Sequence, residues 1–105
     1  MTDDEVRRRV AAGTTTRPEQ LRVLYNDGKC VLVKHPGARV QGEWIPAWVV
    51  LYNTENVGTS GEKWPWRDVW DCDRSKNGPL TRKRLLTLVK KLGLAPEHIR
   101  AGAQA

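Results

Sequence analysis

The chain has 105 residues, 39% of them hydrophobic and 29% charged, which is the composition of a folded protein rather than a disordered one. This length supports one hydrophobic core but no cleft between two lobes, so we expect a single domain over residues 1–100 and no large multi-part enzyme. A formal net charge of +6 and a pI near 9.8 favour an anionic partner.

The N-terminal segment predicts a short helix over residues 2–12. Acidic residues fill its first turn, three arginines follow, and Gly13 stands just past its end, in agreement with the helix dipole and a glycine C-cap. Only Val6 and Val10 form an apolar stripe, so this helix can dock on the domain but cannot organise a core. Residues 16–19 then indicate one further helical turn followed by a strand.

A tight hairpin is predicted around Asp27-Gly28, because this pair supplies the positive backbone angles of a tight turn between strands 21–25 and 29–34. After a loop at residues 35–38, a third strand should run from Trp44 to Tyr52. Pro46 marks its start as an edge or a bulge, because proline cannot donate a ladder hydrogen bond. Both faces of this strand are apolar, so we expect helices on one face and the rest of the chain or a partner on the other.

The segment after the third strand divides into a loop and a short element. Residues 53–61 are rich in Asn, Thr, Ser and Gly and are the best candidate for a mobile segment. The segment Trp64 to Trp70 predicts a short helix, because Pro65 suits a first helical position and Trp66, Val69 and Trp70 would share a face.

The C-terminal helix, from Thr81 to Leu92, has the clearest period in the chain. Leucines and a valine recur along one stripe, and Gly93 followed by Leu94 indicates a Schellman-type end. Residues 95–100 add one more turn, and residues 101–105 form a flexible tail.

Together these elements predict a small α+β domain: an N-terminal helix, a three-stranded antiparallel sheet with a tight hairpin, and C-terminal amphipathic helices packed on one face. The acidic start lacks the apolar stretch of a secretory signal, and the longest apolar run, residues 45–52, is too short to span a bilayer. We therefore expect a cytoplasmic protein with no membrane partner, in which Cys30 and Cys72 stay reduced.

Charge is distributed unevenly along the chain. Residues 1–73 hold ten Lys and Arg against eleven Asp and Glu, a net charge of −1, whereas residues 74–105 hold eight against one, a net charge of +7. On the C-terminal helix the cations fall opposite the leucine stripe, on a face that could lie along phosphates or could simply be solvated. The candidate nucleic-acid-binding residues are Arg74, Lys76, Lys83, Arg84, Lys90 and Lys91.

Five tryptophans and no phenylalanine form a second unusual feature. Tryptophan could fill the core as phenylalanine does elsewhere, or it could stack on bases or anchor a protein interface. We expect Trp48 in the core. Trp64 and Trp66, beside a loop and a proline, are expected to be partly exposed and are the candidate partner-binding residues.

Other kinds of site find little support in the sequence. Residues 73–78 resemble the first half of an EF-hand calcium loop, but Arg84 stands where that motif needs a bidentate glutamate. The cysteines and histidines lack the spacing of structural zinc sites, and Cys30 and His35 would lie on opposite faces of a strand, about 16 Å apart. We therefore expect no metal, no cofactor and no catalytic residue.

The sequence thus favours a small non-enzymatic module that binds nucleic acid through the cationic face of its C-terminal helix. The alternative is a protein-interaction or inhibitor module, which would engage a partner protein through the tryptophan-rich surface around the third strand and Trp64 to Trp70.

Overall fold

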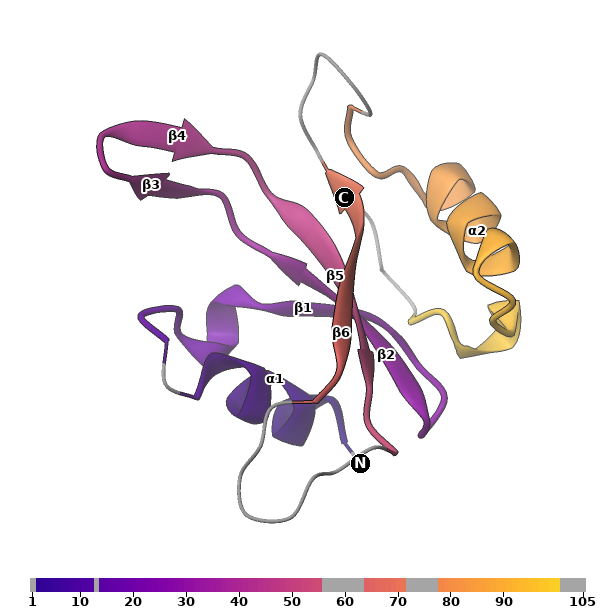
Figure 1. The fold of residues 1–105 in the computed structure, drawn as a ribbon. Helices are drawn as coiled ribbons and strands as arrows, with labels where there is room; N and C mark the ends of the chain where they lie inside the picture. The colour runs from indigo at the N-terminus through magenta and orange to yellow at the C-terminus, as the bar shows by residue number, and fades with distance from the viewer. Residues whose placement is uncertain (1, 13, 56–63, 72–77, 101–105) are drawn as a thin grey trace.

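The computed structural model describes residues 2–12, 14–55, 64–71 and 78–100. Two α-helices, α1 (Asp3–Ala11) and α2 (Arg82–Lys91), lie on opposite faces of a four-stranded antiparallel sheet (Figure 1). The sheet has the order β1 (Arg22–Asn26), β2 (Cys30–His35), β5 (Trp48–Asn53) and β6 (Trp66–Asp71). Two strands, β3 (Ala38–Val40) and β4 (Glu43–Ile45), form a separate ribbon, and two 3₁₀ turns, η1 (Pro18–Gln20) and η2 (Pro96–His98), complete the fold.

The turn between β1 and β2 has the predicted residues in the predicted place. Gly28 has a φ of +88°, which the missing side chain permits. Asp27 Oδ1 accepts the backbone N–H groups of Lys29 and Cys30, each at 2.7 Å, and Asn26 Oδ1 accepts that of Gly28 at 3.0 Å. Side-chain acceptors therefore fix this turn together with the glycine, and each strand lies one residue later than predicted.

Alternation along β2 divides the core into two layers. Leu32 packs on the α2 side of the sheet, whereas its neighbours Val31 and Val33 pack on the α1 side, and all three are fully buried. In β1 the register shifts between Val23 and Tyr25, so that consecutive residues there do not simply alternate. Both faces of β2 are therefore covered, one by α2 and the other by residues of the α1 side.

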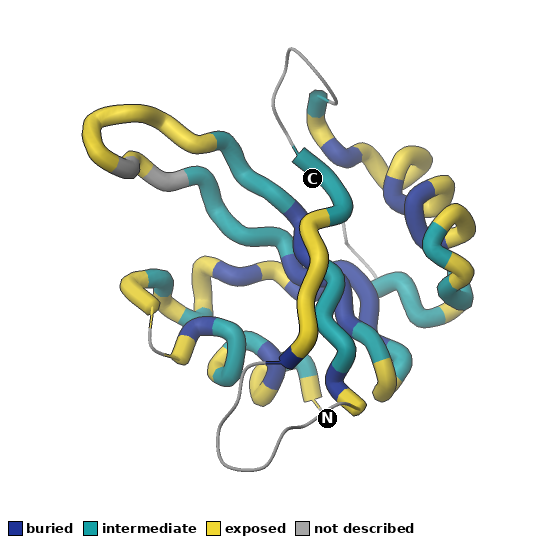
Figure 2. The backbone as a smooth tube through the Cα atoms, viewed as in Figure 1, coloured by how far each residue is buried: buried dark blue, intermediate teal, exposed yellow. Residues whose placement is uncertain are grey.

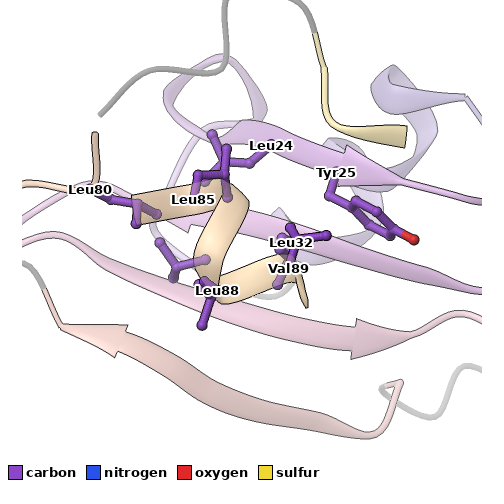
Figure 3. Close-up of a cluster of buried hydrophobic side chains, with 8 residues drawn as sticks. Leu24, Tyr25, Leu32, Leu80, Leu85, Leu88 and Val89 are labelled. Carbon is purple, nitrogen blue, oxygen red and sulfur yellow. The ribbon is translucent and has the colours of Figure 1, made fainter. Parts of the chain in front are cut away.

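Helix α2 closes one face of the sheet with aliphatic side chains. Its buried residues Leu85, Leu88 and Val89 pack against Leu24 and Leu32 of the sheet (Figure 3). The Thr81 hydroxyl accepts the Arg84 backbone N–H at 3.3 Å and caps the N-terminus, while the Leu94 N–H donates to the Val89 carbonyl at 2.9 Å beyond the C-terminus. The predicted C-terminal helix and its Schellman-type end are confirmed.

Helix α1 covers part of the opposite face. Val6 is fully buried and Ala11 nearly so, and Val10 packs beside them against residues of β1 and β2. The Glu5 N–H donates to the Thr2 hydroxyl at 3.2 Å, which caps the helix. The predicted N-terminal helix is confirmed, and so is the following turn, which is η1; the predicted capping glycine, Gly13, lies outside the described residues.

The predicted helix over Trp64 to Trp70 is wrong, because most of this segment is strand β6. It pairs with β5, so that Trp66 lies opposite Tyr52 and Trp70 opposite Val49. Tryptophan and valine favour a pleated surface, and the exposed edge of β5 offers backbone partners that an isolated helical turn lacks. The main sheet therefore has four strands, not the predicted three.

The predicted third strand, from Trp44 to Tyr52, is divided in two. Its first residues belong to β4 and its remainder to β5, with Pro46 between them. Gln41 and Gly42, with φ of +50° and +82°, turn β3 back into β4, so that residues predicted as a loop begin a ribbon that extends from the domain (Figure 1). Trp44 and Ile45 are 64% and 41% exposed there. We call this ribbon, residues 38–45, the arm.

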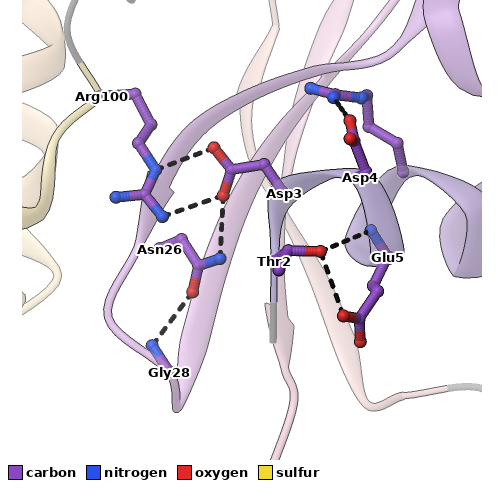
Figure 4. Close-up of polar contacts among 8 residues, drawn as sticks. Thr2, Asp3, Asp4, Glu5, Asn26, Gly28 and Arg100 are labelled. Carbon is purple, nitrogen blue, oxygen red and sulfur yellow. Dashed lines mark hydrogen bonds and ion pairs between the residues drawn. The ribbon is translucent and has the colours of Figure 1, made fainter.

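A polar cluster ties α1 to the last described residue (Figure 4). Arg100 Nε donates to Asp3 Oδ2 and its terminal nitrogen donates to Asp3 Oδ1, both at 2.9 Å, and Asn26 Nδ2 also donates to Asp3 Oδ1 at 3.0 Å. Partial burial acts to raise the pKa of Asp3, but the hydrogen bonds from Arg100 and Asn26 and the charges of Arg100 and Arg7 outweigh it and hold the pKa below its ordinary value.

Burial follows this arrangement (Figure 2): β1 and β2 are largely buried, whereas the arm and the first half of β6 are exposed. The predicted turn at residues 95–100 is confirmed as η2. Most of the predicted mobile segment and the predicted tail fall on residues 56–63 and 101–105, outside the described residues. No helix in the described ranges combines the length and apolarity needed to cross a membrane.

Candidate functional site

The cations predicted to bind nucleic acid divide into two groups. Arg74 and Lys76 fall within residues 72–77, outside the described residues. The other four are exposed on α2: Lys83, Arg84, Lys90 and Lys91. The predicted division of this helix into an apolar face and a cationic face is therefore confirmed.

Three of the four predicted nucleic-acid-binding cations on α2 line one groove. A hollow of about 610 Å³ lies between α2 and the edge strand β6. We call it the α2–β6 groove; its lining residues are Val69, Trp70, Thr81, Lys83, Arg84, Thr87, Leu88 and Lys91. Lys90 is exposed on α2 but does not line the groove.

Helical spacing explains why these polar side chains meet. Lys83, Thr87 and Lys91 are four residues apart, so they form one row along the flank of α2. Two threonine hydroxyls stand among the cations, since Thr81 caps the same helix. None of the described residues that line the groove carries a negative charge. The Thr87 hydroxyl donates to the Lys83 carbonyl at 3.1 Å, whereas the Thr81 hydroxyl accepts the Arg84 N–H and keeps its own hydrogen. The groove therefore combines positive charge with one hydroxyl donor, which is the chemistry that phosphate oxygens bind.

Trp70 supplies the aromatic wall opposite α2. Its ring packs against the α2 side of the core, and Nε1 donates to the carbonyl of Gly78 at 3.3 Å. Arg84 is oriented as well, because one of its terminal nitrogens donates to the carbonyl of Pro79 at 2.9 Å. The wall and one cation are thus held by the segment that leads into the helix, whereas Lys83 and Lys91 have no ion-pair partner in the described part of the chain.

The first turn of α2 has an unusual charge for its position. It contains Arg82, Lys83 and Arg84 and no acid, although the N-terminus of a helix is the positive end of its dipole. The three cations repel one another and the dipole there. A bound anion would reduce these repulsions.

The two candidate partner-binding tryptophans lie on the other side of the sheet from this groove and differ from each other. Trp66 is 60% exposed, as predicted, but the predicted exposure of Trp64 is wrong, because only 3% of that residue is accessible. Arg9 lies over the Trp64 ring at 4.9 Å and Tyr52 meets it edge-on, and these two neighbours cover it. Trp48, expected in the core, is only half-buried.

Cys30 and His35, weighed in the sequence as a possible nucleophilic pair, are apart in the structure. Cys30 and His35 stand at opposite ends of β2, and His35 contacts Trp48 and Tyr52 instead. Burial raises the pKa of the Cys30 thiol, which disfavours the thiolate form that a nucleophile needs. The described residues contain no group of three metal-binding side chains, and the EF-hand-like segment falls mainly on residues 72–77, outside them.

Sequence reasoning did not include Trp70, Thr81 or Thr87 of the groove among the candidate binding residues. Trp70 was assigned to a helix face, and only its pairing with Val49 brings it beside α2. Thr87 carried a usable signal, because it stands midway between Lys83 and Lys91 on one helical row.

Comparison of this chain with protein-family models, with curated proteins and with solved structures found no match. The assignment of a function therefore depends on the geometry and charge of the grooves themselves.

Proposed function

We propose that the protein is a non-enzymatic module that binds single-stranded nucleic acid in the α2–β6 groove. One observation carries the proposal: Lys83, Arg84 and Lys91 line one groove beside an indole ring, with no carboxylate among its described lining residues. Binding to a single strand combines a cationic track for phosphates with aromatic faces for bases.

The parts of the groove have separate roles in this proposal. Lys83 and Lys91, two helical turns apart on α2, each neutralise a phosphate of the strand, and Arg84 adds a third cation at the end where the helix dipole is positive. The Thr81 hydroxyl, which accepts the Arg84 N–H and keeps its own hydrogen, donates a hydrogen bond to a phosphate oxygen. Trp70 offers its exposed ring surface to a base. These contacts hold the backbone and read no base sequence.

A salt titration with a fluorescently labelled single-stranded oligonucleotide tests the proposal. If three phosphates are neutralised, raising salt from about 50 to 200 mM should weaken binding about twentyfold, because each contact releases counterions. We expect micromolar affinity at the lower salt concentration, the ordinary range for electrostatic contact. Absence of binding at that concentration would overturn the proposal.

Two double charge reversals distinguish an effect of the groove from an effect of the protein's net charge. Lys83→Glu with Lys91→Glu should abolish binding, because attraction to phosphate becomes repulsion. The matched control is Arg17→Glu with Arg39→Glu, two exposed cations that lie outside the groove, and it changes the net charge by the same amount. Equal losses in both double variants would show that only net charge matters, and the groove would have no specific role.

The alternative, a protein-interaction or inhibitor function, is favoured by one observation: the arm exposes Trp44 and Ile45, and Trp66 is exposed on β6. Exposed indole rings commonly anchor protein interfaces. Such an interface would be largely insensitive to salt and to the Lys83 and Lys91 reversals, and would weaken on replacement of Trp44 or Trp66. The same salt series and variants therefore distinguish the two functions.

A further inference from the structure

A second groove lies on the α1 side of the sheet. Helix α1 packs chiefly against β1 and η1, and beside it a hollow of about 700 Å³ opens over β5 and β6. We call it the aromatic groove. Its floor is formed by alternate residues of β5, and five of its lining residues carry aromatic rings: His35, Trp48, Tyr52, Trp64 and Trp66. Its volume is that of sites that enclose small organic molecules.

The rings of the aromatic groove are held by contacts with one another. His35 and Trp48 stack with their planes 7° apart and their centroids 5.1 Å apart. His35 Nε2 and the Tyr52 hydroxyl share a hydrogen bond of 2.8 Å. Tyr52 meets Trp64 edge-on at 6.3 Å, and Trp66 lies directly opposite Tyr52 in the sheet. The groove therefore has fixed ring faces before any ligand enters.

Trp66 is the ring that the protein leaves uncovered. It is 60% exposed on the outermost strand, whereas Trp64 is covered by Arg9 and Tyr52. The Arg9 guanidinium already occupies one indole face at 4.9 Å, which shows a cation bound to this set of rings within the chain itself.

The aromatic groove holds one positive and one negative side chain, and only the positive one has a partner among the described residues. Its two ionised side chains are Arg9, which is engaged with Trp64, and Asp68, for which the described residues provide no ion pair or hydrogen bond. Burial lowers the pKa of His35, so that its ring is neutral at neutral pH, and burial together with the charge of Asp68 raises the pKa of Tyr52 to about 12. Asp68 is therefore the one carboxylate in the lining without a partner in the described chain.

We propose that the aromatic groove binds a small alkylammonium compound, with its methylated cationic head against Trp48, Tyr52 and Trp66 and beside the carboxylate of Asp68. Aromatic faces attract such cations through the ring quadrupole, and a quaternary ammonium is desolvated more easily than a primary one. The site is distinct from the α2–β6 groove, because it lies on the opposite face of the sheet and shares no lining residue with it.

An anion or a nucleotide fits the aromatic groove less well. A phosphate there would meet Asp68, while Arg9 would have to leave its indole partner to bind it. One further carboxylate, that of Asp71, lines the neighbouring hollow at the edge of the sheet together with Asp68, and this hollow shares residues with both grooves. A strand of nucleic acid therefore has no continuous cationic path from one groove to the other through the described lining residues.

Calorimetric titration with choline tests the charge requirement. The control ligand is 3,3-dimethylbutan-1-ol, in which a neutral carbon replaces the quaternary nitrogen at the same size. We expect choline to bind about tenfold more tightly, because only the cation gains the attraction to the rings and to Asp68. Equal affinities, or no detectable choline binding at millimolar concentrations, would overturn the proposal.

Two variants and one control test whether choline binds in the aromatic groove. Trp66→Leu and Asp68→Asn should each weaken choline binding about two- to fivefold, and both residues are exposed, so both variants should fold. Trp44→Leu is the matched control, because Trp44 is an equally exposed tryptophan on the arm, outside the groove. Unchanged binding in Asp68→Asn, or equal weakening in Trp44→Leu, would contradict the assignment. Binding of a trimethyl-lysine peptide without binding of choline would show that the groove takes a protein side chain instead.

Discussion

The two helices of this domain differ in the charge of their first turns. Helix α1 begins with Asp3, Asp4 and Glu5 and ends with Arg8 and Arg9, so both ends match the helix dipole. Helix α2 ends with two lysines, as the dipole favours, but has no acid in its first turn and three cations there instead. The charged side chains at both ends of α1 therefore stabilise that helix, whereas the three cations in the first turn of α2 interact unfavourably with its dipole.

Packing compensates for this difference. Helix α2 buries Leu85, Leu88 and Val89 in one continuous cluster, whereas α1 buries only Val6 and Ala11. The helix with the larger apolar contact is thus the one that tolerates unfavourable charge. A well-packed helix can present cations that its own stability does not require, and this is the kind of surface that a binding function can use.

The largest effect should come from breaking the apolar contact of α2. Replacing Leu85 with alanine removes a fully buried side chain and leaves a cavity, so we expect a loss of about 2–5 kcal/mol in the free energy of unfolding. Leu86→Ala, at an exposed position of the same helix, should change stability by about 0.5 kcal/mol or less. Urea denaturation of both variants measures the difference, and similar losses would contradict the assignment of the two faces.

A smaller effect should come from the polar anchor of α1. Asp3→Asn removes the charge that Arg100 pairs with, and we expect a loss of about 1 kcal/mol near neutral pH, because the pair is only partly buried. The pKa of Asp3 is lowered in the folded state, so its stabilising effect is complete above the unfolded value near 4 and is lost as pH falls through the folded value.

Urea denaturation at several pH values between 7 and about 2.5 checks this sign. The wild-type protein should lose more stability than Asp3→Asn as the pH falls, so that the two curves converge at the acid end. Glu19→Gln, which removes an exposed carboxylate of η1 without an ion pair in the described chain, serves as the control. A constant difference between wild type and Asp3→Asn at all pH values would exclude this linkage.

The smallest effect tests the charge pattern of α2 directly. Arg82→Glu places an acid at the positive end of the helix dipole and should stabilise the protein by about 0.3–1 kcal/mol. Lys90→Glu makes the same charge change in the last turn and should destabilise by a similar amount. Neither residue lines the α2–β6 groove. Thermal melts at low salt should therefore shift in opposite directions, and shifts of the same sign would show that net charge, not the dipole, governs stability.

Local signals predicted the two helices and the first hairpin well. The α2 period, its Schellman-type end and the Asp27-Gly28 turn all depend on neighbours within a few residues, and the structure confirms each. The helix predicted over Trp64 to Trp70 was wrong because the structure of this segment depends on a distant part of the chain. Its residues suit a helical face or a strand, and pairing with β5, a partner more than ten residues away, decides the outcome.

In the candidate sites, too, local spacing could be predicted from the sequence, whereas contacts between distant segments could not. The row Lys83, Thr87 and Lys91 could be derived from helical spacing, but the groove it borders needs β6 as its second wall. Exposure of Trp64 was predicted from the nearby proline and loop, whereas the position of Arg9, from α1, covers its ring. The arm was missed because a Gln-Gly turn is a weaker hairpin signal than Asp-Gly, and Gln41 adopts a positive φ that few side chains take.

The contact between Asp3 and Arg100 also orders events during synthesis. The two residues are 97 positions apart in the chain. A ribosome adds roughly 5–20 residues per second, so the guanidinium follows the carboxylate by about 5 to 20 seconds. During this interval Asn26 can already bind Asp3, because the β1–β2 hairpin forms from local contacts. Helix α1 therefore gains its contact with Arg100 only after all four strands of the main sheet and α2 have been synthesised.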